Sequence, residues 1–163
     1  MLVLGIDPGT AITGYGFVAQ DIDLELVECG VVTTKANTPL QDRLLIIHRE
    51  LSTLIERYRP ESVAVEELFF SKNVRTAMSV GHARGVVLLA AAQAGLPVHH
   101  YKPSEVKLAV AGYGGADKQQ VQEMVRLLLG LDEILKPDDA ADAAAVAICH
   151  LHSFRLRQLE AGL

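Results

Sequence analysis

The sequence predicts an α/β sandwich with a mixed five-stranded sheet flanked by helices. Two patterns lead to this prediction. Three apolar segments at the start of the chain follow one another through short turns, as the strands of a meander do. From residue 38 onward, stretches with helical periodicity alternate with two more short apolar segments, which is typical of strands connected by helices.

The first three strands are expected within residues 2–32. Residues 2–7 are almost entirely apolar, which indicates a buried strand. Residues 12–19, which include Gly14 and Gly16, form its expected hairpin partner. Residues 24–32 continue the meander as a third strand.

A helix is expected to begin just after these strands. Thr38 is the expected cap, Pro39 suits a first helical turn, and Gln41 can reach back to complete a capping box. Apolar residues at helical spacing follow until Pro60 stops the helix.

The remainder of the chain alternates between strands and helices, with glycine and proline at the boundaries. The expected elements are a strand at 62–67, a loop at 68–72, a helix at about 73–93, a strand at 97–101, and helices at about 103–110, at 117–129 and from 137 to beyond 152.

Length and composition favour one domain spanning residues 1–163, with a possible flexible tail from about residue 156. The apolar run 85–94 is too short to span a bilayer, so no membrane association is expected. The N-terminus lacks a secretory signal, and Cys29 and Cys149 build no disulfide framework. We therefore expect a cytoplasmic protein.

The net charge of −5 argues at first against a nucleic-acid partner. However, residues 70–126 contain seven Lys/Arg and only three Asp/Glu, so the middle of the chain is basic. A basic segment can hold phosphate even in an acidic protein, because the local field matters more than the total. A merely solvated surface explains the charge pattern equally well.

Carboxylates stand where a folded sheet would gather them. Asp7 ends the first strand, and the adjacent Glu66 and Glu67 end the fourth. Only one of that pair can share a face with Asp7, and strand parity alone does not decide which. Asp139 and Asp142 are three residues apart in the first turns of the last helix. Acids there also stabilise a helix dipole, but together the four carboxylates suggest a cage for divalent cations.

The hairpin motif Gly-Ile-Asp-Pro-Gly-Thr at residues 5–10 has two further interpretations. Asp-Pro-Gly is by itself a good turn. A strand followed by Asp-Gly-Thr also cradles ATP phosphates in actin-like kinases, but such enzymes need a second lobe that 163 residues do not provide.

Two other features could serve interactions. The loop residue Phe69 is expected to stack on an unpaired base, whereas the neighbouring Phe70 could equally be part of a small local core. Met78, Gly81 and Gly85 on the long helix leave room for a second helix, which could belong to the same chain or to a dimer partner.

Five motifs, taken in order, resemble the RuvC family of bacterial Holliday junction resolvases. They are Gly-Ile-Asp-Pro-Gly-Thr, Ala-Val-Glu-Glu-Leu-Phe-Phe-Ser-Lys-Asn, His-Ala-Arg-Gly-Val, Gly-Gly-Ala-Asp-Lys-Gln-Gln-Val-Gln and Asp-Ala-Ala-Asp-Ala. The resemblance covers nearly the whole chain. It implies a ribonuclease-H-like fold, a homodimer, and metal-dependent cleavage of four-way DNA junctions.

The resemblance also assigns roles to individual residues, and it selects Glu66 over Glu67. The implied catalytic acids and metal ligands are Asp7, Glu66, Asp139 and Asp142, and the implied catalytic lysines are Lys107 and Lys118. The implied DNA-contacting residues are Phe69, Lys107 and Lys118, and Lys72, Asn73 and Arg75 nearby are expected to contact DNA as well. If the implied homodimer uses the long helix, Met78, Gly81 and Gly85 are the candidate dimer residues.

The chemistry implied is hydrolysis by two Mg²⁺ ions, for which Mn²⁺ can substitute. One ion would activate the attacking water and the other would stabilise the leaving oxygen, giving a 5′ phosphate and a 3′ hydroxyl. A branch-migration motor complex is the implied further partner. The alternatives are a related nuclease that acts on RNA and a DNA-binding module without activity.

Overall fold

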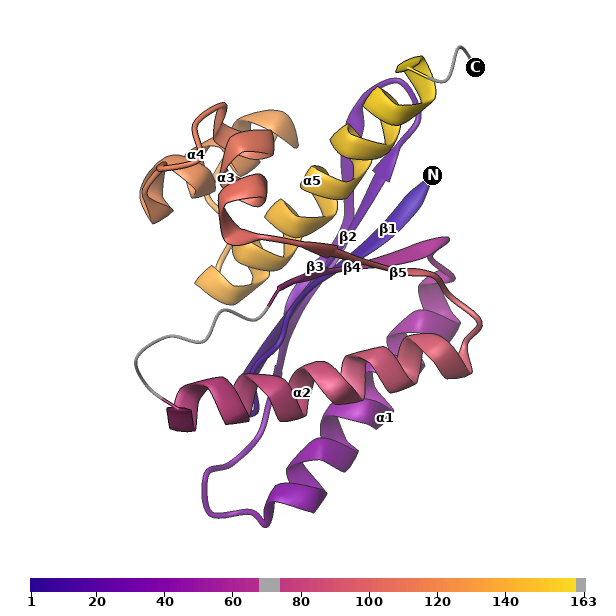
Figure 1. Cartoon of the computed structure of the whole chain (residues 1–163), viewed down its shortest axis with the longest axis vertical. Helices are drawn as coiled ribbons and strands as arrows, with labels where there is room; N and C mark the ends of the chain where they lie inside the picture. Colours follow the sequence, from indigo (N-terminus) through magenta and orange to yellow (C-terminus); the bar gives the residue numbers. More distant parts are fainter. Residues whose placement is uncertain (68–73, 161–163) are drawn as a thin grey trace.

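The structure is a computed structural model that describes residues 1–67 and 74–160 (Figure 1). Strands and helices alternate after an initial meander, as the sequence predicts. In chain order the elements are β1 (Leu2–Asp7), β2 (Ile12–Gln20), β3 (Leu24–Thr33), α1 (Leu40–Tyr58), β4 (Ser62–Glu66), α2 (Val74–Gln93), β5 (Val98–Tyr101), α3 (Pro103–Ala111), α4 (Lys118–Leu128) and α5 (Asp138–Glu160).

The five strands form one mixed sheet in the order β3-β2-β1-β4-β5. The meander supplies the antiparallel pairs β1/β2 and β2/β3, while β4 pairs in parallel with β1 and with β5. The predicted mixed five-stranded sheet is therefore confirmed. Because β1 lies in the centre of this sheet, its residues are buried by helices on both faces.

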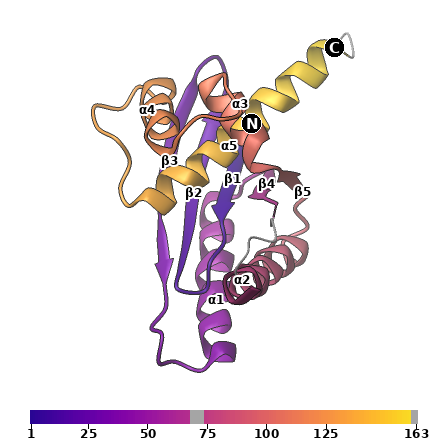
Figure 2. The same cartoon turned by 60° about the vertical axis from the view of Figure 1, so that its left-hand side comes forward.

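The helices form a layer on each side of the sheet (Figures 1 and 2). One layer consists of α1 and α2, which pack on the face that carries Leu4, Ile6 and Val65. The other contains α5, flanked by α3 and α4, and it covers the face that carries Val3 and Ala64. Alternate residues of one strand thus enter two different cores.

The helix α5 lies unusually close to the sheet. A Cβ atom on Gly5 would overlap the backbone carbonyl oxygen of Ala143, and one on Gly16 would lie 3.0 Å from the Cα of Ala144. The small alanine side chains of α5, nearly all buried, allow the same approach from the helix side. The alanines of α5 and the glycines of β1 and β2 therefore both serve to bring the helix close to the sheet.

The start of α1 differs from the prediction. The helix begins at Leu40, its N-cap is Pro39, and no side chain caps it. The expected capping by Thr38 and Gln41 is therefore wrong. The backbone N–H of Thr38 donates instead to the carbonyl of Lys35 at 3.1 Å, so the turn before the helix uses Thr38.

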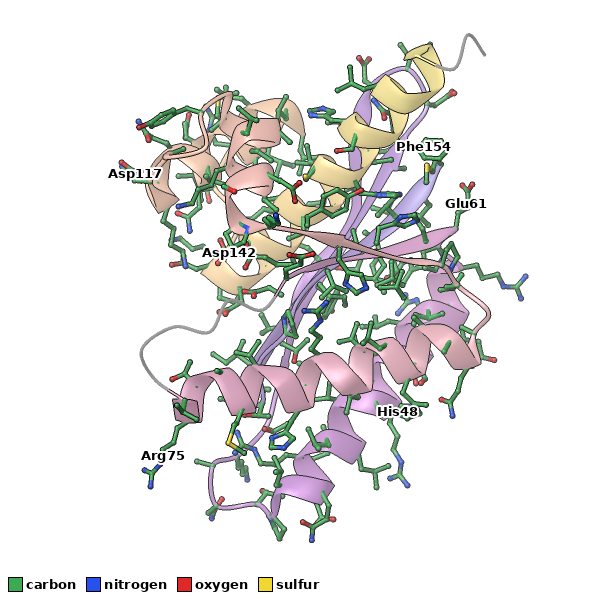
Figure 3. The ribbon with its side chains drawn as sticks, viewed as in Figure 1. His48, Glu61, Arg75, Asp117, Asp142 and Phe154 are labelled. Atoms are coloured by element: carbon green, nitrogen blue, oxygen red, sulfur yellow. The ribbon has the colours of Figure 1, made fainter. Side chains whose placement is uncertain are left out.

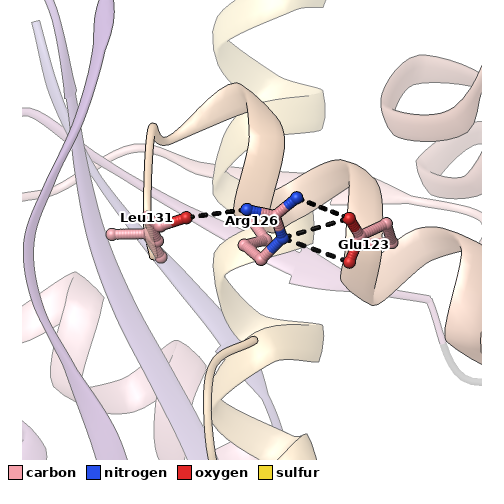
Figure 4. Close-up of polar contacts among 3 residues, drawn as sticks. All are labelled: Glu123, Arg126 and Leu131. Atoms are coloured by element: carbon pink, nitrogen blue, oxygen red, sulfur yellow. Dashed lines mark hydrogen bonds and ion pairs between the residues drawn. The ribbon is translucent and has the colours of Figure 1, made fainter. Parts of the chain in front are cut away.

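Helix α4 is fixed at both ends. At its start the Asp117 carboxylate accepts from the backbone N–H of Gln120 at 2.8 Å, and the Gln120 side chain completes a capping box. Near its end the Arg126 guanidinium donates to the Glu123 carboxylate at 2.6 Å and to the carbonyl of Leu131 at 3.0 Å (Figure 4). This anchoring matters because Lys118 is the first residue of α4.

The last helix runs beyond His152, as the sequence predicts, and it extends to Glu160. Residues 156–160 are Leu, Arg, Gln, Leu and Glu, which all favour helix. Among the described residues, no helix has the length and apolar character needed to cross a bilayer.

We expect Gly5→Ala to lower the free energy of unfolding by about 3 kcal/mol, because the added methyl group must push α5 away from the sheet. Chemical denaturation measures the change. Gly114→Ala is the matched control, since its Cβ would lie 3.5 Å from the nearest atom, an ordinary contact. Equal losses in the two variants would contradict the close contact between α5 and β1.

Candidate active site

The pairing of β1 with β4 brings two acids to one edge of the sheet. The strands are parallel and Ile6 is level with Val65, so Asp7 and Glu66 end them side by side. Gly5 contacts α5 and Ala64 lies in the core beneath α5, so the alternating residues Asp7 and Glu66 share the α5 face. Glu67 follows the end of β4. The structure thus brings Glu66, rather than Glu67, to Asp7.

The start of α5 brings the second pair of acids to the same place. Gly14 is the partner of Asp7 in the β1/β2 ladder, and a Cβ on Gly14 would overlap the backbone of Asp139. The first turn of α5 therefore lies directly over the end of β1. Asp142 follows one turn later, on the side of α5 that faces α3 and α4 (Figure 3).

A cleft of about 220 Å³ lies where these elements meet. Its charged residues are Asp7, Glu66, Asp142, Lys107 and Lys118, and the remaining walls are mainly apolar side chains of α3, α4 and α5. Five of the six residues predicted to be catalytic therefore line one cavity. Asp139 does not line it.

Asp7 is the most strongly perturbed acid. Burial, together with repulsion from Asp142, Glu66 and Asp139, raises the pKa of Asp7 to about 7, against the smaller opposing effect of Lys118. Asp139 therefore lies close enough to act on Asp7 although it does not line the cleft. A carboxyl group that titrates near neutral pH in a cleft is typical of functional sites.

The other two acids of the cleft are shifted in the same direction. Burial and then the charge of Asp142 raise the pKa of Glu66, while Lys107 lowers it. Burial also raises the pKa of Asp142, against the lowering effect of Lys118. The cleft therefore contains more negative charge than its two lysines neutralise, and it favours added cations.

Lys118 is the cation held most firmly here. Its ammonium lies 3.2 Å from the carboxylate of Asp142 and 3.5 Å from that of Asp138. Partial burial would lower the pKa of Lys118, but these two acids raise it. Within residues 1–67 and 74–160, no three Asp, Glu, His or Cys side chains meet closely enough to ligate one ion as they stand.

A buried histidine of α5 forms hydrogen bonds with residues of β4 and β5. His150 of α5 contacts the Tyr101 hydroxyl at 2.7 Å through Nδ1 and the Ser62 hydroxyl at 3.2 Å through Nε2. Tyr101 is the ladder partner of Glu66, and Ser62 begins the same strand. His150 therefore ties α5, which carries two of the acids, to the strands beside Glu66.

Neither Cys149 nor His152 extends this site. Burial raises the pKa of the Cys149 thiol to about 11, despite a hydrogen bond with Ser153 that lowers it, so the thiol is a poor nucleophile at neutral pH. Nδ1 of His152 lies 3.1 Å from the backbone carbonyl of Ala109. These residues instead attach α5 to its surroundings.

The remaining predicted contact residues are not among those that line the cleft in the described part of the chain. Phe69, Lys72 and Asn73 lie outside the described residues, as does Phe70. Arg75 is exposed in the first turn of α2 (Figure 3). Met78, Gly81 and Gly85 are exposed on the same helix, so they do not pack on the chain's own sheet.

Sequence reasoning missed three residues at the site. The sequence alone assigns no role to Asp138, although it directly precedes the candidate acid Asp139. Tyr101 and His150 come from segments that gave no hint of contact. Their side chains meet only because β5 lies next to β4 beneath α5.

Comparison with known proteins agrees with this geometry. Residues 3–150 match the family described as Crossover junction endodeoxyribonuclease RuvC. A protein of that name from Roseiflexus sp. (strain RS-1) is 60% identical over 161 residues, which cover 98% of this chain and 96% of the relative.

Solved structures show the same likeness. A T. thermophilus RuvC in complex with Holliday junction substrate has a TM-score of 0.91 and 44% identity, with 96% of each chain covered. The yeast mitochondrial Holliday junction resolvase Ydc2 has a TM-score of 0.64 at 18% identity, covering 92% of this chain and 78% of that one, and is alike in fold alone. The predicted ribonuclease-H-like fold is confirmed.

We expect the stability of the metal-free protein to fall as the pH rises from about 4 to 7. Folding raises the pKa of Asp7 from 3.8 to about 7, so in this range the folded state holds a proton that the unfolded state has lost. Asp7→Asn removes the contribution of Asp7, so the dependence should weaken, and at pH 8 the variant should be more stable than the wild type by about 1–3 kcal/mol.

Denaturation at pH 5 and pH 8, with and without a divalent cation, measures this effect. The cation should stabilise the wild type at pH 8 far more than Asp7→Asn. Asp23→Asn, in the exposed turn between β2 and β3, is the control and should behave as the wild type. A wild-type protein that is no less stable at pH 8 than Asp7→Asn would contradict the shifted pKa.

Proposed function

Because the chain belongs to the RuvC family of crossover junction endodeoxyribonucleases, we propose that its substrate is the four-way DNA junction, which it resolves by paired symmetric nicks. One observation carries the proposal. Acids from β1, β4 and α5 and lysines from α3 and α4 converge on a single cleft. An ATP-binding hairpin or a DNA-binding module without activity needs no such convergence.

The acids fit divalent metal ions. Carboxylate oxygens are the ligands that Mg²⁺ prefers, and the raised pKa of Asp7 reflects, after burial, carboxylates that repel one another without a cation. Asp7, Glu66, Asp139 and Asp142 would hold two Mg²⁺ ions, with Mn²⁺ as a substitute. Bound there, the ions would supply Lewis-acid activation of the attacking water and stabilisation of the leaving 3′ oxygen.

The lysines act on the phosphate. Lys107 and Lys118 lie on the side of the cleft formed by α3 and α4, across from the strand-end acids. Their charge would attract the scissile phosphate and stabilise the additional negative charge that develops during hydrolysis. The expected ends are a 5′ phosphate and a 3′ hydroxyl.

Contacts outside the cleft would select the junction. We propose that Phe69 stacks on an unpaired base, while Lys72, Asn73 and Arg75 hold the DNA backbone. The position of Arg75 in the first turn of α2, which follows β4 and Glu66 in the chain, supports this assignment. A branch-migration motor and a cytoplasmic location are the remaining parts of the proposal.

A homodimer would match the two-fold symmetry of the junction. Helix α2 carries an exposed stripe of apolar or small residues, namely Val74, Met78, Gly81, Gly85 and Leu89. Their spacing places them on one face of the helix, opposite the buried Ala83, Val87 and Ala90. Gly85 has no atom near its Cβ position, so a second α2 could approach closely.

We expect Asp7→Asn to abolish junction cleavage while retaining junction binding, since the variant loses a metal ligand but keeps every lysine and arginine. Cleavage of a synthetic four-way junction is followed with and without Mg²⁺, and binding is measured in Ca²⁺ at fixed salt. Linear duplex DNA and structured RNA serve as competitors. Normal nicking by the variant, or stronger competition by RNA than by junction DNA, would contradict the assignment.

We expect Met78→Glu to convert the dimer to a monomer, because it places a charge in the centre of the α2 stripe. Light scattering at micromolar concentration measures the mass. Leu127→Glu, at a leucine of α4 that is 55% exposed against 58% for Met78, is the matched control and should stay dimeric. A monomeric wild type would disprove the dimer.

A further inference from the structure

Lys118 is shared between two acids with different positions. Its ammonium lies 3.2 Å from Asp142, which lines the cleft, and 3.5 Å from Asp138, which does not. Asp138 is the first residue of α5 and Lys118 the first of α4. The shared ion pair therefore joins the starts of the two helices at the rim of the cleft.

Asp138 is held in place independently of Lys118. Its other carboxylate oxygen lies 3.4 Å from the ammonium of Lys136. Asp138 therefore keeps a cationic partner whether or not Lys118 is bound to it.

A divalent cation and the ammonium of Lys118 would compete for the carboxylate of Asp142. Under the proposed function, on which this inference rests, Asp142 ligates a divalent cation and Lys118 neutralises the DNA phosphate. A divalent cation bound to Asp142 would neutralise its carboxylate and repel the nearby ammonium, so Lys118 would lose its nearer partner when the metal binds. A lysine side chain without a partner gains rotamer freedom and samples many positions.

We propose that Asp138 is a positioning residue for Lys118. It retains the ammonium at the rim of the cleft when a divalent cation takes Asp142, so that Lys118 is in place when the phosphate arrives. In the metal-free protein it also draws Lys118 partly away from Asp142, which eases entry of the cation. Asp138 itself contacts neither metal nor DNA.

A double-mutant cycle tests the proposal, with the wild type, Asp138→Asn, Lys118→Ala and the double variant. Single-turnover cleavage of a four-way junction is measured at saturating Mg²⁺. Asp138→Asn should slow the wild type about tenfold but the Lys118→Ala protein less than about twofold, because the two residues act as one unit. Equal slowing in both backgrounds would show that Asp138 acts without Lys118 and would overturn the proposal.

Calorimetric titration with Mn²⁺ in the absence of DNA provides a second readout. Asp138→Asn should weaken Mn²⁺ binding about threefold in the wild type, where Lys118 then rests on Asp142 alone, and should leave it unchanged in Lys118→Ala. An equal weakening in both would make Asp138 a general acidic charge and overturn the proposal. If the wild type fails to cleave junctions, the proposed function fails, whereas this titration still tests the positioning role.

Two control variants complete the design. Glu133→Gln removes the same charge from the exposed segment before α5 and should cleave at the wild-type rate. Lys136→Ala removes the second cationic partner of Asp138 and should slow cleavage less than Asp138→Asn, because Lys118 keeps both acids. A loss in Glu133→Gln as large as that of Asp138→Asn would assign the effect to overall charge and overturn the proposal.

Discussion

The close contact between α5 and the glycines of β1 and β2 is the constraint on which the site depends. With a larger residue at Gly5 or Gly14, the helix could not reach the sheet, and Asp139 would not lie over the end of β1. The same contact explains why α5 consists largely of alanine. Packing that would be unremarkable in a core thus fixes the distance between acids that are 132 residues apart in the sequence, Asp7 and Asp139.

The charged acids of the cleft destabilise the folded state when no cation is bound. Three carboxylates with raised pKa values share a partly buried space, and Lys107 and Lys118 compensate them only in part. Stability by itself would favour apolar residues there, since unpaired buried charge is costly. Local conflicts of this kind are expected where function, rather than folding, selects the residues.

The sequence was sufficient for the strands, the helices and three of the four acids, because periodicity and strand ends are local features. It could not decide between Glu66 and Glu67 without the resemblance, because alternation along a strand does not say which face a helix covers. The structure supplies this information, since Gly5 contacts α5 and so marks the face that Asp7 shares. The sequence also predicted Thr38 as the cap of α1, but in the structure the backbone N–H of Thr38 bonds to Lys35 in a turn before the helix. The contacts of His150 and of Asp138 join distant segments, so no local pattern reveals them.

Under the proposed function, metal binding at this cleft would be an exchange of cations. Near neutral pH, Asp7 is partly protonated because its pKa is about 7, and Asp142 is paired with the ammonium of Lys118. A divalent cation would displace the proton from Asp7 and the ammonium from Asp142, so two positive charges leave those carboxylates as two arrive. For the first of the two proposed ions, the charge at these two carboxylates would then change little. This exchange explains how a cluster of acids can persist in the folded chain before any metal is bound.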